Sequence, residues 1–173
     1  METMNPKVLI SEEAIRSRVF ELAAEISRDF AGRELTVVGV LNGSFVFMAD
    51  LVRAIDLPLR CDFLGLSSYG SATESSGVVA ITKDLAVPIE GRDILVVEDI
   101  VDTGLTLAYL QENLSTRHPR SVKVATLLSK PDRRKVEVSV DYLGFTIEDR
   151  FVVGYGLDFD GIFRNLRYIG LME

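Results

Sequence analysis

The sequence has very little of what disulfides and zinc sites require. Its 173 residues include one cysteine, Cys61, and one histidine, His118. A single cysteine excludes a disulfide within the chain and is typical of a protein in the reducing cytoplasm. We expect Cys61 to be a small buried residue of a strand. The lone histidine argues against a zinc site, because such sites need several cysteine or histidine ligands.

Long apolar runs and clusters of positive charge are also missing. No stretch is apolar for long enough to cross a bilayer, and acidic residues stand near the start, where a secretory signal would be apolar. The formal net charge is −7, whereas nucleic-acid-binding domains usually have a basic face. We therefore expect a cytoplasmic protein with neither a nucleic acid nor a membrane as partner. A phosphorylated small molecule is compatible with this charge, because it needs only local positive groups.

Two common nucleotide-binding motifs, the Walker loop and the Gly-x-Gly-x-x-Gly fingerprint, are absent as well. In their place, the apolar run 94–97 ends at Glu98 and Asp99, and Asp102-Thr103-Gly104-Leu105-Thr106 follows before a helical pattern begins at Leu107. Buried parallel strands read as apolar runs, and ligands bind at their carboxyl ends. The N-terminus of the following helix would offer free N–H groups to a phosphate. The segment therefore predicts an anion site with acidic residues beside it.

Carboxylates next to a phosphate site need partners of their own. Glu98 and Asp99 would accept hydrogen bonds from sugar hydroxyls or bind Mg²⁺, which prefers oxygen ligands. Asp102 would then be free to act on a reacting group. The simpler alternative is that Asp102 or Thr103 only caps the helix and that the acidic pair is solvated. We favour the functional interpretation, because three acids at a strand end make a poor cap.

An earlier segment repeats the order of strand, turn and helix. Residues 35–41 predict a buried strand and residues 45–55 a helix. Asn42, Gly43 and Ser44 lie between them and would form a second phosphate cradle through their backbone N–H groups. Alternatively, they form a tight turn that is capped by Ser44.

Strand and helix patterns alternate along the rest of the chain. We predict helices over 12–31, with Ser11 as the cap, and 107–115, and strands over 60–66, 78–82, 121–128, 136–142, 151–157 and 166–171. This alternation predicts one α/β domain over residues 1–173, with a mainly parallel central sheet flanked by helices.

Two polar segments interrupt this pattern. Residues 67–77 are polar and glycine-rich, which is typical of a surface loop. Lys130 begins a basic run that follows a predicted strand. We interpret Arg133, Arg134 and Lys135 as a solvated loop, whereas Lys130 lies at the sheet edge where ligands gather.

The motif Val97-Glu98-Asp99-Ile100-Val101-Asp102-Thr103-Gly104 resembles the phosphoribosyl diphosphate motif of type I phosphoribosyltransferases. The resemblance runs from about Val8 to the C-terminus through four separated motifs, and it is strongest to the bacterial members that act on hypoxanthine and guanine. It implies the type I phosphoribosyltransferase fold, with a core over roughly 33–150 and a small hood made from the N- and C-terminal segments. It also implies a purine salvage enzyme that makes IMP or GMP, and a homodimer or homotetramer.

The same resemblance assigns roles to individual residues. Asp102 would be the catalytic base, acting on the purine while phosphoribosyl diphosphate is bound by Asn42, Gly43, Ser44, Ser68, Tyr69, Glu98, Asp99, Asp102, Thr103, Gly104, Leu105, Thr106 and Arg164. The base would be bound by Lys130, Phe151, Val152 and Asp158, and Mg²⁺ by Asp158, Glu98 and Asp99. Ser68-Tyr69 would belong to a lid over the donor. Family members often carry lysine at the position of Asn42, which puts a charged side-chain contact there in doubt.

Three alternatives stay open at this stage. The enzyme could prefer xanthine, because the shared motifs read the sugar phosphate and only a few contacts select the base. A pyrimidine-operon regulator has the same fold and binds RNA, although the net charge disfavours it. A nucleotide-binding domain without catalytic activity is the third alternative.

Overall fold

The computed structural model of the protein describes residues 5–69 and 78–173. In chain order its elements are β1 (Lys7–Ile10), α1 (Glu12–Asp29), β2 (Leu35–Leu41), α2 (Phe45–Ala54), β3 (Leu59–Tyr69), β4 (Val78–Lys83), β5 (Asp93–Val101), α3 (Leu105–Ser115), β6 (Ser121–Ser129), the 3-10 helix η1 (Pro131–Arg133), β7 (Tyr142–Thr146), β8 (Val152–Val153) and β9 (Ile169–Leu171). None of the helices in these two ranges is long and apolar enough to cross a membrane.

Six strands form the central sheet, in the order β4-β3-β2-β5-β6-β7. β4 pairs antiparallel with β3, whereas the pairs from β3 to β7 are all parallel. The mainly parallel α/β sheet that the sequence predicts is thereby confirmed. β5 lies between β2 and β6, so its carboxyl end is surrounded by the ends of other parallel strands.

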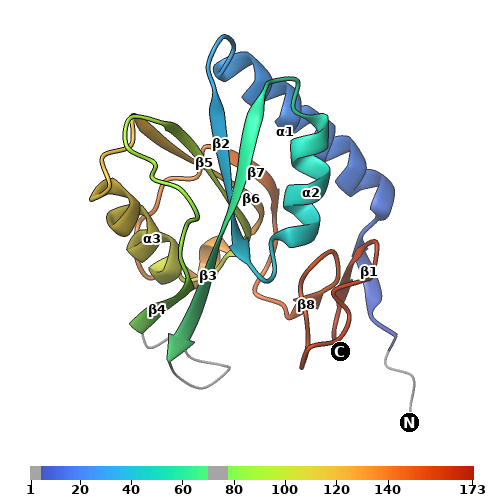
Figure 1. Cartoon of the computed structure of the whole chain (residues 1–173). Helices are drawn as coiled ribbons and strands as arrows, with labels where there is room; N and C mark the ends of the chain where they lie inside the picture. The colour runs from blue at the N-terminus through green and yellow to red at the C-terminus, as the bar shows by residue number, and fades with distance from the viewer. Residues whose placement is uncertain (1–4, 70–77) are drawn as a thin grey trace.

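Helices cover both faces of this sheet (Figure 1). α1 and α2 lie on one face, where Leu95 and Val97 of β5 join their buried side chains. α3 lies on the other face and packs against Ile94 and Val96. Because residues 94–97 of β5 point alternately to two covered faces, all four are apolar. This explains the unbroken apolar run that precedes Glu98.

The ends of the helices follow local sequence signals. Ser11 Oγ accepts a hydrogen bond from the Ala14 N–H at 3.1 Å, as expected of an N-cap. Ile15, Leu22 and Ile26 are buried on one stripe of α1. α3 begins at Leu105, two residues before the predicted start, and its cap is Gly104 at φ +87°.

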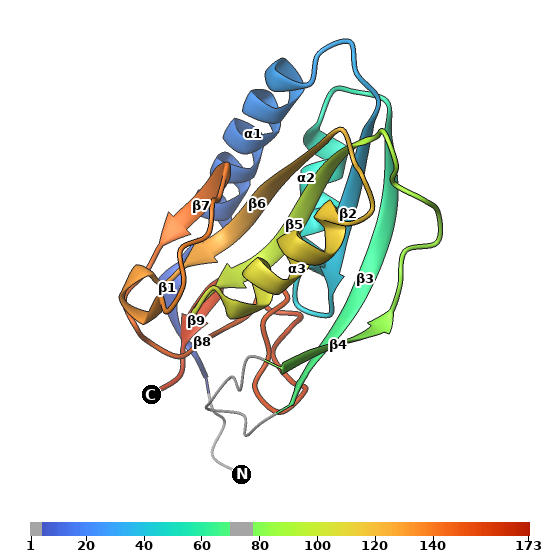
Figure 2. The same ribbon diagram turned by 90° about the vertical axis from the view of Figure 1, so that its left-hand side faces the viewer.

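A second, three-stranded antiparallel sheet has the order β1-β9-β8. Its strands come from opposite ends of the described chain, with Lys7 beside Leu171 and Val152 on the other side of Leu171. Figure 2 shows this small sheet at the end of the molecule toward which β2 and β5 point. We call β1, β8, β9 and the connecting residues 154–168 the hood.

The expected strand over 136–142 is wrong. The strand that pairs with β6 is instead Tyr142–Thr146. Val138 and Val140 still pack against the apolar cluster around α3, but the N–H groups of Lys135 and Val136 donate to Thr103 O instead of to a strand. A loop held against the core can therefore bury alternate side chains without belonging to a sheet.

Three smaller expectations need correction. The terminal strands are shorter than predicted, because β8 has two residues and β9 three. β1 has no counterpart among the predicted elements. Cys61 lies in β3 but is exposed, because β4 joins β3 only from Gly65 onward and leaves its first half at the sheet edge.

Candidate active site

The carboxyl ends of β2 and β5 open into a cavity of about 570 Å³. It is lined by residues from both strand ends, from the start of α3 and from the hood, including Asn42, Gly43, Glu98, Asp99, Asp102, Thr103, Gly104, Thr106, Asp158 and Arg164. Ten predicted site residues are thus brought together from four separate segments. Topology explains the gathering, because parallel strands end at the same edge of the sheet.

Gly43 and Asp99 are packed so closely that a side chain at position 43 would require the turn or the Asp99 carboxylate to shift. A Cβ on Gly43 would stand 1.8 Å from Asp99 Oδ2. The peptide between Leu41 and Asn42 is cis. Ser44 does not cap α2 through its side chain, because its hydroxyl donates to Val40 O at 2.6 Å. The Ser44 hydroxyl is therefore engaged within the turn, and Asn42 and Gly43 line the cavity next to the acidic pair.

Glu98 and Asp99 are acids without cationic partners. Burial, followed by the negative charge of Asp99, raises the pKa of Glu98 well above its usual range. Burial also raises the pKa of Asp99 to about 6, although the Ile100 N–H donates to Asp99 Oδ1 at 2.7 Å and opposes the shift. No ion pair within 5–69 and 78–173 involves either residue. The site therefore has unmet capacity to accept hydrogen bonds or a cation.

Hydrogen bonds within the loop before α3 and from residues 135 and 136 hold this loop in place. The Leu105 N–H lies 3.3 Å from Thr103 Oγ1, and Thr103 is buried. Thr103 O accepts hydrogen bonds from the N–H groups of Lys135 and Val136. The first turn of a helix leaves N–H groups without intrahelical partners. A fixed loop and these N–H groups together suit a phosphate.

Asp102 differs from the other two acids because it has a partner. Arg133 Nε donates to Asp102 Oδ1 at 2.8 Å. The hydrogen bond and the charge of Asp102 raise the pKa of the Arg133 guanidinium. The interpretation of Arg133 as part of a solvated loop is therefore wrong: its guanidinium is tied to the residue predicted as the catalytic base.

The hood closes the other side of the cavity. Asp158 Oδ2 accepts a hydrogen bond from the Gly161 N–H at 2.8 Å, and Asp158 Oδ1 lies 3.3 Å from Arg164 Nη2. Arg164 Nη1 donates to Gly156 O at 2.7 Å. Gly156 in turn packs on the turn after β2, since a Cβ there would stand 2.2 Å from Gly43 O. The hood thus holds Asp158 and Arg164 directly beside the Asn42–Ser44 turn.

The remaining predicted base-binding residues lie outside the lining of this cavity. Lys130 is buried and begins η1, and its N–H donates to Val101 O at 2.9 Å. Phe151 is 53% exposed, and its ring meets that of Phe159 edge to face at 5.8 Å between centroids. Val152 is buried in β8. An exposed aromatic pair of this kind is available for stacking on a flat ligand.

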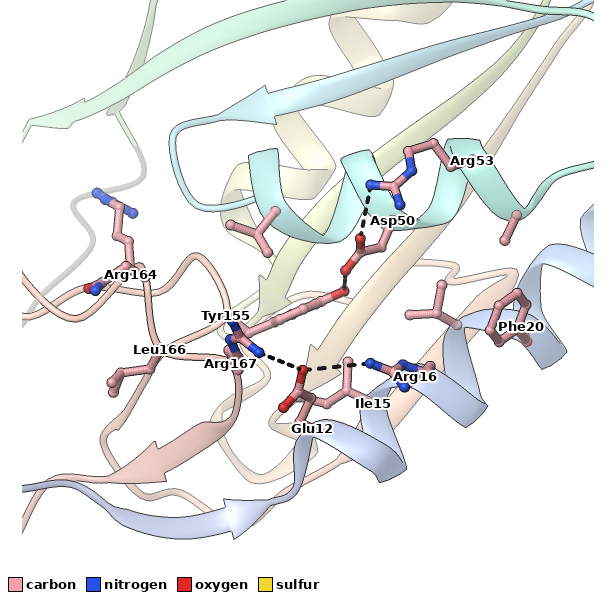
Figure 3. Close-up of a pocket in the computed structure, with 14 residues that line it drawn as sticks. Glu12, Ile15, Arg16, Phe20, Asp50, Arg53, Tyr155, Arg164, Leu166 and Arg167 are labelled. Carbon is pink, nitrogen blue, oxygen red and sulfur yellow. Dashed lines mark hydrogen bonds and ion pairs between the residues drawn. The ribbon is translucent and has the colours of Figure 1, made fainter.

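A second cavity, of about 480 Å³, lies between α1, α2 and the hood (Figure 3). Its acids already have partners: Glu12 lies 3.7 Å from Arg16 and 3.8 Å from Arg167. Asp50 accepts a hydrogen bond from Tyr155 and lies 3.8 Å from Arg53. Arg164 borders both cavities, but the unpaired acids lie only in the first. We therefore place the active site at the carboxyl ends of β2 and β5.

The family model of the phosphoribosyl transferase domain matches residues 10–160. The chain belongs to the phosphoribosyltransferase family. It is 54% identical over 172 residues to the hypoxanthine-guanine phosphoribosyltransferase of Mycobacterium avium, covering 96% of this chain and 85% of the relative. It is 51% identical to the enzyme of that name from Bacillus subtilis, covering 96% and 93%.

Solved structures of phosphoribosyltransferases have the same fold. A crystal structure of a hypoxanthine-guanine phosphoribosyltransferase from Bacillus anthracis superposes with a TM-score of 0.93 at 48% identity, covering 98% of this chain and all of the other. A hypoxanthine phosphoribosyltransferase from Staphylococcus aureus gives a TM-score of 0.93 at 47% identity, covering 96% and 91%. The resemblance inferred from the sequence motifs is therefore confirmed.

The phosphoribosyltransferase site also contains residues that the sequence motifs did not indicate. Leu66, Ser67 and Val79 line the cavity, and Arg133 and Phe159, which lie outside its lining, contact the predicted residues Asp102 and Phe151. Of the predicted residues, Ser44 and Leu105 lie in the turn and the helix start but do not line the cavity. The side chains of Ser68 and Tyr69, and the lid residues 70–77, lie outside the described part of the structure. Their roles stay predictions.

Proposed function

We propose that the protein transfers the 5-phosphoribosyl group of phosphoribosyl diphosphate to N9 of hypoxanthine or guanine. The products are IMP or GMP and diphosphate, which makes this a purine salvage reaction. The observation that carries the proposal is the gathering of Glu98, Asp99 and Asp102 beside the N-terminus of α3. This cavity occurs in a chain that is about half identical, over nearly its whole length, to enzymes named for this reaction.

The donor's phosphoribosyl part fits the loop between β5 and α3. The 5-phosphate would bind the N–H groups of the first turn of α3 and the hydroxyls of Thr103 and Thr106. The ribose hydroxyls would donate to Glu98 and Asp99. Hydroxyl donors would supply hydrogen bonds to these two carboxylates. Such hydrogen bonds favour the charged form and so oppose the rise in pKa that burial causes.

The diphosphate would lie between the turn after β2 and the hood. The backbone N–H groups at Asn42, Gly43 and Ser44 suit its oxygens, and the Arg164 guanidinium is the cation that lines the same cavity wall. Because Asn42 replaces the lysine that family members often have, this chain would rely on backbone donors at that point. Ser68 and Tyr69 would cover the donor and keep water out while the anomeric bond is broken.

Mg²⁺ fits this site as a partner of the diphosphate. In the part of the chain that the structure describes, no three acidic, histidine or cysteine side chains form a ready-made metal cluster. Mg²⁺ usually keeps several waters and needs only one or two carboxylates in addition to substrate phosphates. Asp158, with Asp99 and Glu98 nearby, would hold it. When bound, the cation would neutralise charge on the departing diphosphate.

The purine would lie between Lys130, Val152 and Phe151. The Lys130 ammonium can only donate, so it would donate a hydrogen bond to the exocyclic oxygen of a 6-oxopurine and would reject the amino group of adenine, which is also a donor. A mismatched buried polar pair of this kind discriminates by about 10⁴-fold. Phe151 would stack on the ring, and Val152 would recognise it through backbone groups. Asp102 would accept the imidazole proton as N9 bonds to the sugar.

The decisive experiment compares hypoxanthine, guanine, xanthine, adenine and uracil under identical conditions with phosphoribosyl diphosphate and Mg²⁺. We expect nucleotide formation from hypoxanthine or guanine, and loss of it when the metal is removed with a chelator. A product from adenine or uracil alone contradicts the role of Lys130, and a preference for xanthine contradicts the assigned base. RNA binding with a steep dependence on salt would instead indicate the regulator.

The proposal includes a homodimer or homotetramer in the cytoplasm. Light scattering coupled to size-exclusion chromatography measures the assembly directly, and a monomer at micromolar concentration would contradict this part alone.

A further inference from the structure

Arg133 is the residue whose position the proposed function does not yet explain. It ends η1, the short helix that follows Lys130. Its Nε lies 2.8 Å from Asp102 Oδ1, and its Nη1 lies 3.8 Å from Asp149 Oδ2. The two side chains of the closer pair are 37% and 40% exposed, and Asp102 is the member of the pair that lines the cavity. Arg133 thus contacts the proposed base directly, through Asp102 Oδ1.

Backbone hydrogen bonds fix the main-chain position of Arg133 relative to Asp102. The Arg133 N–H donates to Lys130 O at 3.1 Å. Two residues further on, the Lys135 N–H donates to Thr103 O at 2.8 Å. Lys130 itself is tied to Val101 O at 2.9 Å. Both ends of the segment that carries Arg133 are therefore anchored to residues next to Asp102, and the two side chains meet without a long mobile connection.

We propose that Arg133 is a positioning residue for Asp102. By holding Oδ1 it fixes the plane of the carboxylate and leaves Oδ2 free to accept the imidazole proton of the purine. The inference rests on the proposed function, because it assigns Asp102 the purine as its reaction partner. A guanidinium Nε–H is a rigid, directed donor, whereas a lysine ammonium is a point charge on a flexible stem. Orientation of this kind lowers a barrier because the reacting groups are already aligned.

A positioning role predicts a specific pattern of kinetic effects. Arg133→Met should lower kcat about 10- to 100-fold and leave the KM for phosphoribosyl diphosphate within about twofold, because donor binding does not use Arg133. Arg133→Lys should restore part of kcat, since it keeps the charge but not the directed Nε–H. The matched control is Lys135→Met, which removes the same charge from the same segment. The Lys135 side chain is exposed and makes no contact with Asp102, so this variant should keep wild-type kinetics.

The double variant Asp102→Asn/Arg133→Met tests whether Arg133 acts through Asp102 or only stabilises the fold. In an Asp102→Asn background the carboxylate is already gone, so adding Arg133→Met should lower kcat by less than about twofold further. Thermal unfolding of each variant is measured in parallel to show that all are folded. A loss as large in the Asp102→Asn background as in the wild type would overturn the inference, and so would full activity of Arg133→Met.

The inference and the proposed function fail in different ways. A wild-type protein that forms no nucleotide from hypoxanthine or guanine contradicts both. An active wild-type enzyme whose kcat is unchanged by Arg133→Met contradicts the inference alone.

Discussion

The two ends of strand β5 both carry buried carboxylates, but only one end gives them partners. At the amino end, Asp93 accepts hydrogen bonds from Arg120 and, at 2.6 Å, from Ser121 Oγ, and these partners lower its pKa. At the carboxyl end, Glu98 and Asp99 form no ion pair within the described residues, and burial raises their pKa values although the charge of Arg164 opposes the shift of Asp99. The same strand therefore holds one acid that stabilises the fold and two that cost stability.

This difference identifies the working end of the sheet. Perturbed pKa values gather at functional sites, where a ligand supplies the partners that buried acids lack. Asp93 makes the contrast sharp, because it shows that this chain does pair a buried acid on β5 when no ligand is involved. The carboxyl end carries the residues that we propose to bind the sugar, the phosphate and the cation, whereas the acid at the amino end already has its partners.

The largest expected difference between the two ends concerns catalysis. Asp102→Asn, at the carboxyl end, should lower kcat about 10²- to 10³-fold, because it removes the proposed proton acceptor. The KM for phosphoribosyl diphosphate should change far less. Steady-state kinetics with hypoxanthine measures both, and Asp93→Asn at the amino end is the control that should keep wild-type kcat. Equal losses in kcat and donor affinity would contradict the role of Asp102.

A methyl group at Gly43 should come next in size. Gly43→Ala places a Cβ where Asp99 Oδ2 now stands, so either the turn or the carboxylate must move. We expect kcat/KM for the donor to fall about 10- to 100-fold. Gly91→Ala is the matched change at the other end: it has φ +70° and open space around it, so it should cost about 1 kcal/mol of stability and no activity. Comparable activity losses in the two variants would remove the distinction between the ends.

Asp93→Asn should reduce stability instead of activity. The variant loses the charged hydrogen bonds of Asp93, which should cost about 1–2 kcal/mol of stability at about pH 7. The cost should not be larger, because Arg120 is largely exposed and solvent screens its charge. The pKa of Asp93 is lowered on folding, so its contribution is present above the unfolded value of 3.8 and is lost as the pH falls through the folded value. Urea unfolding of the wild type and the variant should therefore begin to converge as the pH falls below 3.8, and should meet only below the lowered pKa of the folded protein. A deficit that persists unchanged in acid would show that packing, not charge, is responsible.

The smallest expected effect is that of Asp99→Asn, which should raise the free energy of unfolding instead of lowering it. The pKa of Asp99 is raised from 3.8 to about 6 on folding, so the wild type loses stability as the pH rises through this range. Asp99→Asn should leave stability unchanged near about pH 4 and raise that of the free protein by about 1 kcal/mol above about pH 7. Urea unfolding at the two pH values measures this. A variant less stable than the wild type at the higher pH would mean that Asp99 is already paired in the free protein.

The sequence predicts the centre of this molecule well because the signals there are local. An apolar run must lie in a strand covered on both faces, and the acids, glycine and helix that follow it place the site at the strand's end. The turn at Asn42–Ser44 carries the same kind of signal. In each case strand, turn and helix are adjacent in the chain, so their pattern is sufficient to indicate the geometry.

The features that sequence reasoning missed depend on contacts between distant segments. Arg133 lies in a basic run that looks solvated until Asp102 is placed beside it. The alternation of Val136, Val138 and Val140 looks like a strand because packing against α3 buries the same side as strand pairing would. Phe159 meets Phe151 only after the hood has folded back. None of these contacts has a local pattern that distinguishes it from its alternative.

The pairing of β1 with β9 has a consequence for synthesis on the ribosome. Chains emerge N-terminal end first, so β1 appears before every other described element and its partner β9 appears after all of them. The central sheet, with the loop before α3, can assemble while β1 still has an unoccupied edge that other chains could join. The part of the cleft that we propose to bind the sugar phosphate, at the end of β5, is therefore completed earlier in translation than the part formed by the hood.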